Sequence, residues 1–358
     1  MQRAPGLLLA TLIAIAAYQI HALPIPPFSI GDPVRHPIDA MLIAIVLGLL
    51  FRNTVGMPAR LVPGVRAAVV SLTAIGIVMM GAKLDFQDMA RTSVSALAIS
   101  VVCVVAALAL TIWLCRRLGV NDKLGMLIGV GTAICGSSAI AVAAPVIEAD
   151  DSDTAFSIAT VTLFGMIAVF VLPLLGNLIG LDETEFGVWA GTSVHAVPQV
   201  VAAGFAYGPT AGEVATIVKL VRVLLLAPVV IGLAIWYGRQ KRAKQIAHIT
   251  RIGSLRTLVP PFIVGFLVLA LANTLHLLPD FTLHLRESFL WEAGDRPIVL
   301  AQLVTSISSF LLTISMAGVG MGVDLRGLAR VGLGALYVGL ASAVLLAGFS
   351  LVLLRVLL

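Results

Sequence analysis

Two basic residues, Lys219 and Arg222, lie inside an otherwise apolar stretch of the sequence, residues 214–237. Their spacing of three places both side chains on one face of a helix. If that helix starts near Gly212, Arg222 lies about 15 Å along it, close to the middle of a bilayer. A basic side chain at that depth costs at least about 2.5–3.5 kcal/mol, so it should face a partner or a cavity. We therefore predict that this pair binds a negatively charged substrate.

Two structural roles compete with this interpretation. A long basic side chain can extend to the lipid headgroups, which Lys219 could do more easily than Arg222. The two residues could instead belong to a structural ion pair. Glu213 is the only acid in this helix, and it lies near the end and on a different face. We therefore favour substrate binding.

A second candidate is the stretch 131–140, which reads Gly-Thr-Ala-Ile-Cys-Gly-Ser-Ser-Ala-Ile inside another apolar segment. Glycine and hydroxyl side chains weaken a helix, and an interrupted helix at membrane depth is tolerated where it lines a cavity or is buried in protein. The N-terminus of a half-helix presents free N–H groups to anions. We predict an interruption between about Thr132 and Ser138, with Gly136, Ser137 and Ser138 contacting the substrate. The alternative is a stripe of small residues for helix packing.

A third group consists of His195 and Gln199, which are four residues apart on one helical face. Pro198 lies between them and removes a backbone donor, which frees carbonyls in the preceding turn. We predict that both side chains contact the substrate and that His195 can act as a titratable coupling group. A single intramembrane histidine can also simply bond a neighbouring helix.

These residues belong to a very apolar chain. Of its 358 residues, 59% are hydrophobic and 11% are charged, whereas soluble domains carry about 25% charged residues. Apolar runs long enough to cross a bilayer recur along the whole chain. We predict an all-α polytopic membrane protein with a single transmembrane domain, 1–358, and about eleven spans, at residues 5–22, 38–51, 65–83, 93–114, 124–147, 156–181, 186–207, 214–237, 258–277, 298–321 and 331–358. The first could also be a signal peptide, but no convincing cleavage site follows it.

The basic residues set the predicted orientation. With the N-terminus inside, the inward loops hold most arginines and lysines, and an outward loop holds the acidic run 148–153. This asymmetry follows the positive-inside rule. One inward loop, 182–185, has no basic residue. The C-terminus is then expected outside.

Two pairs of similar sequence segments, each of which we call an echo, suggest internal repeats. Residues 84–91 resemble 323–330, seven spans later, which is the parity of an inverted repeat. Residues 131–143 resemble 191–203, but under the predicted topology these segments run parallel and cannot be inverted copies. We interpret the second echo as similar local chemistry.

Several functions are disfavoured by what the sequence lacks. The acids lie in loops or near helix ends, whereas cation carriers coupled to protons or sodium usually need an acid deep in the bundle. The three cysteines and six histidines show no metal-ligand spacing, so we expect no metal, no cofactor and no catalytic residues. The net charge of +5 does not indicate nucleic acid, because in a membrane protein the location of lysine and arginine reports the topology.

Taken together, these motifs resemble the YeiH-type bacterial inner-membrane proteins, which carry the label of sulfate exporters. The resemblance covers nearly the whole chain from the second span onward, and it rests on residues 131–140 with Pro145, 156–165, Gly191 with 193–200, and 219–222. It implies a secondary carrier distantly related to the cation–proton antiporters and bile-acid symporters. It further implies an inverted-repeat fold, with crossed, broken helices in a core and a separate panel domain. The missing buried acid departs from those antiporters and counts against cation exchange.

We therefore predict a secondary active transporter, an exporter or exchanger, for a small anion such as sulfate, an organosulfonate or a carboxylate. The alternatives are an anion channel or, with less support, a polytopic membrane enzyme. The expected location is the bacterial inner membrane, with a cytoplasmic N-terminus and a periplasmic C-terminus. The expected partners are the anion and the lipid bilayer, and a homodimer is also considered.

Overall fold

The computed structural model describes residues 3–25, 38–83, 86–240, 261–278, 281–285, 294–298, 300–324 and 333–357. The protein is an all-α membrane protein, and seven of the described helices are long and apolar enough to cross a bilayer. Two short strands, β1 (Phe281–Leu285) and β2 (Gly294–Ile298), pair antiparallel in a hairpin between helices α15 and α16. The predicted all-α membrane class is thus confirmed, with this small addition.

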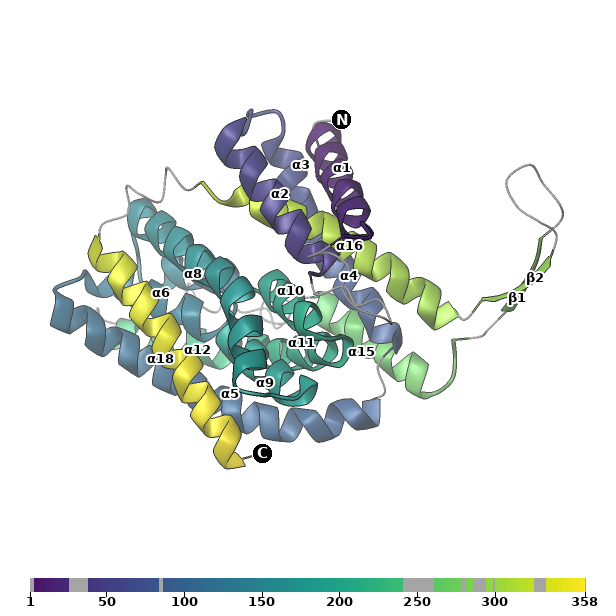
Figure 1. Ribbon diagram of the computed structural model, residues 1–358. Coiled ribbons are helices and arrows are strands. Elements are labelled where there is room, and N and C mark those ends of the chain that lie inside the picture. Colours follow the sequence, from purple (N-terminus) through teal and green to yellow (C-terminus); the bar gives the residue numbers. More distant parts are fainter. Residues whose placement is uncertain are drawn as a thin grey trace.

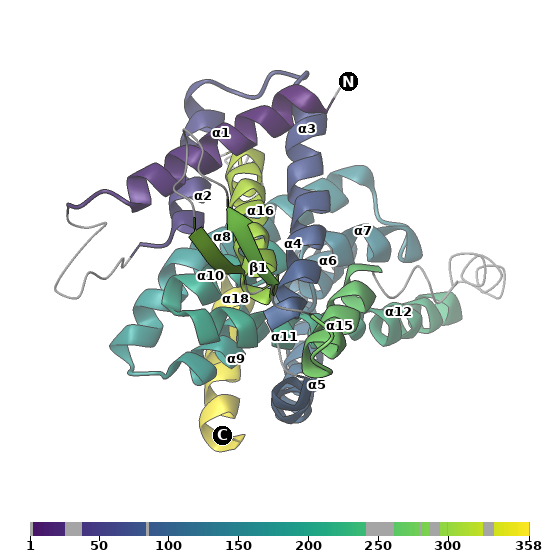
Figure 2. The ribbon, with the colours of Figure 1, turned by 90° about the vertical axis from the view of Figure 1, so that its right-hand side faces the viewer.

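The helices form two packed groups (Figure 1). The first, which we call the scaffold, contains α1 (Ala4–His21), α2 (Ala40–Thr54), α3 (Val62–Ala67), a π-helical turn (Ala68–Leu72), α4 (Thr73–Met80), a 3₁₀ turn (Gly81–Lys83), α15 (Pro261–Thr274) and α16 (Leu300–Gly322). Here α16 packs against α2 and α4, and α1 lies across α2 and α3 (Figure 2). Glycine permits the crossing of α1 and α3, because a Cβ at Gly6 would lie 2.1 Å from the Leu61 carbonyl oxygen.

The second group, which we call the core, contains α5 (Phe86–Leu118), α6 (Asp122–Ala133), α7 (Ser137–Val146), α8 (Asp151–Leu178), α9 (Glu183–Ser193), α10 (Val197–Tyr207), α11 (Pro209–Leu224), α12 (Leu226–Gln240) and α18 (Leu333–Leu357). Helices α11 and α12 form one long apolar element with a break at Leu225. The core contains both interrupted segments that carry the predicted site.

The first interrupted segment, α6–α7, is a helical hairpin that we call hairpin A. Its two ends lie side by side. The Lys123 ammonium at one end donates to the Glu148 carbonyl oxygen at the other, at 2.5 Å. Nearby, Asn121 at the start of α6 donates to the Asp153 carboxylate at 3.0 Å. The chain reverses at Ile134–Gly136, where Gly136 has φ +73°. The predicted interruption of the helix is confirmed, but the segment returns to the side from which it entered.

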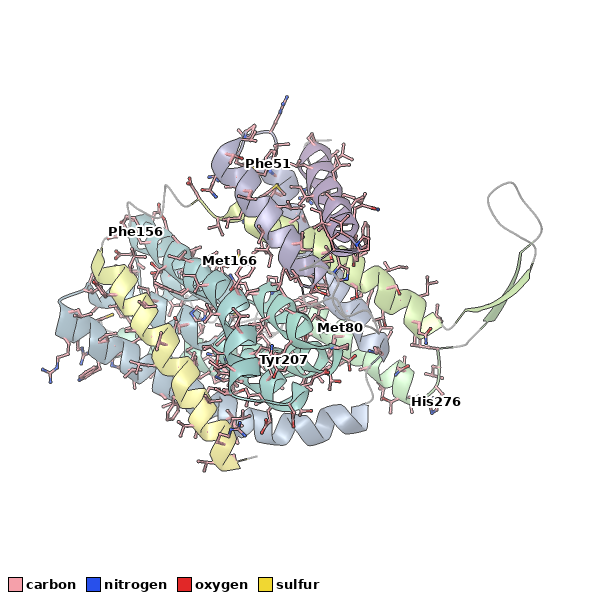
Figure 3. The ribbon with its side chains drawn as sticks, viewed as in Figure 1. Phe51, Met80, Phe156, Met166, Tyr207 and His276 are labelled. Carbon is pink, nitrogen blue, oxygen red and sulfur yellow. The ribbon has the colours of Figure 1, made fainter. Side chains whose placement is uncertain are left out.

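The second interrupted segment, α9–α10, is a similar hairpin that we call hairpin B. It starts with a capping box between Asp182 and Glu185, which bonds the free N–H groups of the first turn. At its end Tyr207 stacks on Phe186 with ring centroids 3.9 Å apart, and the Tyr207 hydroxyl donates to the Leu181 carbonyl. Figure 3 shows Tyr207 among the core helices. Hairpin B therefore also begins and ends on one side.

The hairpins enter from opposite ends of α8. That helix has 28 residues, a length of about 42 Å. Its first turn contacts hairpin A through Asp153, and near its far end a Cβ on Gly176 would lie 2.5 Å from the Phe186 ring.

This arrangement corrects two predictions. Segments 124–147 and 186–207 are not spans and do not run parallel, and the crossed helices implied by the resemblance are replaced by two hairpins. The echo between 131–143 and 191–203 thus joins segments that enter from opposite directions. The other echo, 84–91 with 323–330, lies largely outside the residues whose side chains are described.

Candidate functional site

The tips of the two hairpins meet inside the core. A Cβ added to Gly136 would lie 3.4 Å from the Ala196 Cβ. At each tip one half-helix ends and another begins: α6 ends at Ala133 and α7 begins at Ser137, while α9 ends at Ser193 and α10 begins at Val197. Two helix C-termini and two helix N-termini are thereby gathered in one place. C-termini carry unpaired carbonyls and partial negative charge, and N-termini carry unpaired N–H groups and partial positive charge.

Arg222 bonds the C-terminal side of both tips. Its guanidinium is fully buried and donates to the carbonyls of Thr132, Ala133 and Thr192, the bond to Thr132 measuring 2.8 Å. These carbonyls belong to the last turns of α6 and α9, and carbonyls at a helix C-terminus have no intrahelical donor. Arg222 therefore satisfies backbone groups from two hairpins at once and holds their tips together.

Lys219 acts in the same way one turn earlier on α11. Its ammonium is fully buried and donates to the Val194 carbonyl at 2.7 Å. The acid considered as its partner, Glu213, instead pairs with Lys83 of the scaffold at 2.6 Å. Both basic residues thus contact backbone carbonyls, which neither the anion-binding prediction nor the ion-pair alternative anticipated. The physical reason is that helix C-termini offer negative charge without any acidic side chain.

A cavity of about 510 Å³ lies on the N-terminal side of the tips, between core and scaffold. The residues of the two tips that line it are Cys135, Ser137, Ser138, Ala196, Val197, Pro198 and Gln199. Lys219 and Arg222 are not among its described lining residues, so the structure does not place this pair beside the cavity that hairpin A lines. Ser137 and Ser138 do line it and are exposed to it. The Ser138 hydroxyl donates to the Cys135 sulfur at 2.9 Å, whereas the Ser137 hydroxyl has no bonded partner in the described part of the chain.

Gln199 lines the cavity but uses its amide within the protein. Its Oε1 accepts from the Ala196 N–H at 3.1 Å, and its Nε2 donates to the Thr162 carbonyl of α8 at 3.1 Å. The contact with α8 is close, since a Cβ on Gly165 would lie 2.0 Å from Oε1. Gln199 therefore caps α10 and fastens hairpin B to α8.

His195 points away from this cavity. It is buried beside a second, mostly apolar cavity of about 410 Å³ between α8, α9 and α18. Its Nδ1 donates to the Ser193 carbonyl at 3.1 Å, and its Nε2 has no partner among the described residues. The structure thus separates His195 from Ser137 and Ser138: His195 lines the second cavity, whereas the next residue, Ala196, is extended and lines the first.

The scaffold side of the cavity was not anticipated. It is formed by Val69, Val70, Thr73, Ala74 and Ile77 around the π-helical turn, with Phe262 of α15 and Gly318, Val319 and Gly322 of α16. Single π-turns frequently occur at functional sites, but this apolar run carries no sequence signal for one. Thr73 is a polar residue that could have indicated this side of the cavity. Its hydroxyl is hydrogen-bonded to Ser315 of α16.

Comparison with known proteins identifies the family. Residues 5–339 match the family described as "Conserved hypothetical protein 698". The chain belongs to this family, the UPF0324 membrane proteins. It is 36% identical to a UPF0324 membrane protein of Bradyrhizobium diazoefficiens, over 92% of this chain and 86% of the relative. A relative from Agrobacterium fabrum is 33% identical over 99% and 90% of the two chains. The UPF0324 membrane protein TauZ of Paracoccus denitrificans is 34% identical over 89% and 88%. The resemblance to the YeiH-type family is thereby confirmed.

Proposed function

We propose that this UPF0324 protein is a secondary active transporter of a small anion across the bacterial inner membrane. The observation that carries the proposal is the meeting of two hairpin tips, whose half-helices α7 and α10 begin at one internal cavity. Helix N-termini favour anions through their free N–H groups and their dipole. Half-helices at mid-membrane form the substrate sites of many secondary transporters.

The charge distribution around the tips supports the same conclusion. Arg222 and Lys219 bond the carbonyls of the helix C-termini, so the negative dipole ends are neutralised behind the site. On the cavity side the first turn of α7 in hairpin A presents its N–H groups, and none of the described residues that line the cavity is acidic. In our proposal the two basic residues therefore favour the anion through the hairpins that they hold, and the direct contacts come from the N–H groups of hairpin A and the hydroxyls of Ser137 and Ser138.

The position of the cavity favours a carrier over a channel or an enzyme. It lies between the scaffold and the core, so a movement of the hairpins against the scaffold would open it to either side in turn. No cluster of metal-ligating side chains occurs in the described ranges, and the described tips present no nucleophile with a bonded base. We propose transport without a cofactor.

We also propose nine membrane crossings, formed by the seven long apolar helices together with the shorter α2 and α15. Reducing the predicted eleven crossings to nine leaves the N-terminus in the cytoplasm and the C-terminus in the periplasm. It moves the loop 182–185, which has no basic residue, to the periplasm, and it moves the acidic run 148–153 to the cytoplasm beside Lys123. Because acidic residues contribute little to orientation, this topology satisfies the positive-inside rule better than eleven spans.

The test compares two substitutions at the first residue of α7. Ser137→Ala removes only the hydroxyl, whereas Ser137→Pro also removes the backbone N–H, and proline is well tolerated at the first position of a helix. Purified protein is tested for thermal stabilisation by sulfate, sulfonates and carboxylates, and for uptake of the stabilising anion into proteoliposomes. A ligand that binds the native state raises the apparent stability.

We expect Ser137→Pro to weaken the stabilisation more than Ser137→Ala, with little change in the unfolding temperature of either ligand-free variant. Equal responses of wild type and Ser137→Pro to the same anion would contradict an anion site at this helix N-terminus. Stabilisation without uptake would contradict transport.

A further inference from the structure

The walls of the cavity determine which kind of anion it suits. Apart from the hairpin tips, most of the lining is hydrocarbon: Val69, Val70, Ala74 and Ile77 of the scaffold, Val142 of α7, Val223 and Leu226 of α11 and α12, Phe262 of α15 and Val319 of α16. The polar side chains of the lining are those of the hairpin tips, Thr73 and Thr162 of α8, whose carbonyl accepts from Gln199. Thr73 is already bonded to Ser315, and Gln199 is bonded on both ends of its amide. The cavity therefore combines polar groups at the hairpin tips with mostly apolar walls.

The volume of the cavity adds a second constraint. At about 510 Å³ it could hold on the order of fifteen waters, each needing about 30 Å³. An inorganic oxyanion with five heavy atoms would fill only a small part of this space. The remainder would be water against valine, isoleucine and phenylalanine side chains, which is unfavourable compared with apolar contact. Pockets of about 300–1,000 Å³ with mostly apolar walls and a few polar groups are typical of organic ligands.

From these two observations we infer that the transported anion is organic: a carboxylate or sulfonate whose acidic group lies at the hairpin tips and whose apolar body lies along the π-helical turn and α16. This inference rests on the proposed function and narrows its substrate class. Inorganic sulfate could accept hydrogen bonds at the hairpin tips, but it has no apolar group to contact the walls. The π-helical turn has a specific part here, because it contributes Val69 and Val70, two adjacent residues that both line the cavity.

The experiment is a chain-length series measured by thermal shift on the purified full-length protein. The ligands are sulfate, methanesulfonate, butanesulfonate, hexanesulfonate and the matching carboxylates, with an uncharged alcohol of each length as a control. Burial of one methylene contributes about 0.8 kcal/mol, which is about a four-fold gain in affinity. We expect affinity to rise by up to about four-fold per methylene until the cavity is filled, with the alcohols binding more weakly at every length.

A matched pair of substitutions places the effect in the cavity. Val70 lines the cavity and is 62% exposed, so Val70→Thr adds a hydroxyl to the apolar wall with little effect on folding. Val352 on α18 is 60% exposed and does not line the cavity, so Val352→Thr is its control. We expect Val70→Thr to flatten the dependence on chain length while leaving methanesulfonate binding unchanged, and Val352→Thr to change neither.

The outcomes separate this inference from the proposed function. Sulfate binding that is tighter than that of every alkyl sulfonate, with no gain along the series, would overturn the organic anion and leave anion transport intact. Equal binding of alcohols and anions would overturn both, and so would the absence of binding by any ligand. A rising series that Val70→Thr does not flatten would place the apolar body outside this cavity and contradict the inference.

Discussion

Hairpins A and B are built on the same plan but differ at their tips. Gly131-Thr132 of the first corresponds to Gly191-Thr192 of the second, sixty positions later, and both hairpins present a helix C-terminus to Arg222. At the tip, however, hairpin A has Gly136 with φ +73°, whereas hairpin B has Ala196 in an ordinary extended conformation. The next positions differ as well, since Ser138 of hairpin A corresponds to Pro198 of hairpin B.

These differences assign the hairpins separate roles. In hairpin B two N–H groups of the tip are not available, because the Ala196 N–H donates to Gln199 and Pro198 has no N–H. Tyr207 and the capping box fix the other end. In hairpin A the first turn of α7 faces the cavity with two exposed serines. Hairpin A is thus suited to bind the ligand and hairpin B to support it, and the following predictions test this division.

The largest effect is expected at the residue that the two hairpins share. Arg222→Leu leaves the carbonyls of Thr132, Ala133 and Thr192 without their donor, and a buried group left unbonded costs about 1–3 kcal/mol. We expect a large fall in the thermal unfolding temperature of the ligand-free protein, and loss of the anion response with it. The control is Arg355→Leu, which removes an ion pair with Glu185 whose arginine side chain is 50% exposed; such pairs contribute about 0–1 kcal/mol. A stable Arg222→Leu protein that has lost only its ligand response would restore the direct anion-binding role first predicted.

A smaller loss of stability should distinguish the turn at the tip of hairpin A from the turn at the tip of hairpin B. Gly136 has φ +73° and ψ −133°, a region that side chains other than glycine adopt at a cost of about 1–3 kcal/mol. Gly136→Ala should therefore destabilise the protein by about that amount and impair anion binding, because the tip must shift. Ala196→Gly, at the equivalent position of hairpin B, should cost less than about 1 kcal/mol. Unfolding temperatures of the two variants, measured side by side, give the answer, and equal losses would refute the asymmetry of the tips.

The smallest effect would make hairpin B more like hairpin A. Pro198→Ser restores a backbone N–H and adds a hydroxyl at the cavity wall, matching Ser138. One additional hydrogen bond contributes about 0.5–1.5 kcal/mol, so we expect anion affinity to rise by about two- to ten-fold if the ligand reaches both tips. Affinity is measured by thermal shift against anion concentration, with Pro173→Ser in the interior of α8 as a comparison. An unchanged affinity would mean that hairpin B supports the site without contacting the ligand.

Much of this protein could be predicted from local sequence. Apolar runs with few charges lead to membrane helices because the bilayer offers no hydrogen bonds to the backbone. The glycines and serines at 131–138 indicated the interruption for the same reason, since a helix weakened there needs a cavity or protein around it. The cost of burying Lys219 and Arg222 showed that both needed partners.

The tertiary structure decided how those pieces are used. Whether an apolar segment crosses the membrane or turns back depends on contacts between its two ends, such as Lys123 with Glu148 and Tyr207 with Leu181, and hydropathy does not record them. The partners of Arg222 proved to be backbone carbonyls from residues about 30 and 90 positions away, which every residue type possesses and no sequence pattern reveals. The apolar wall of the cavity comes from scaffold and core helices together, each an ordinary hydrophobic run when considered alone. Residue chemistry and periodicity are local properties of the chain, whereas the direction of a hairpin, the partner of a buried charge and the lining of a cavity arise only when distant segments pack together.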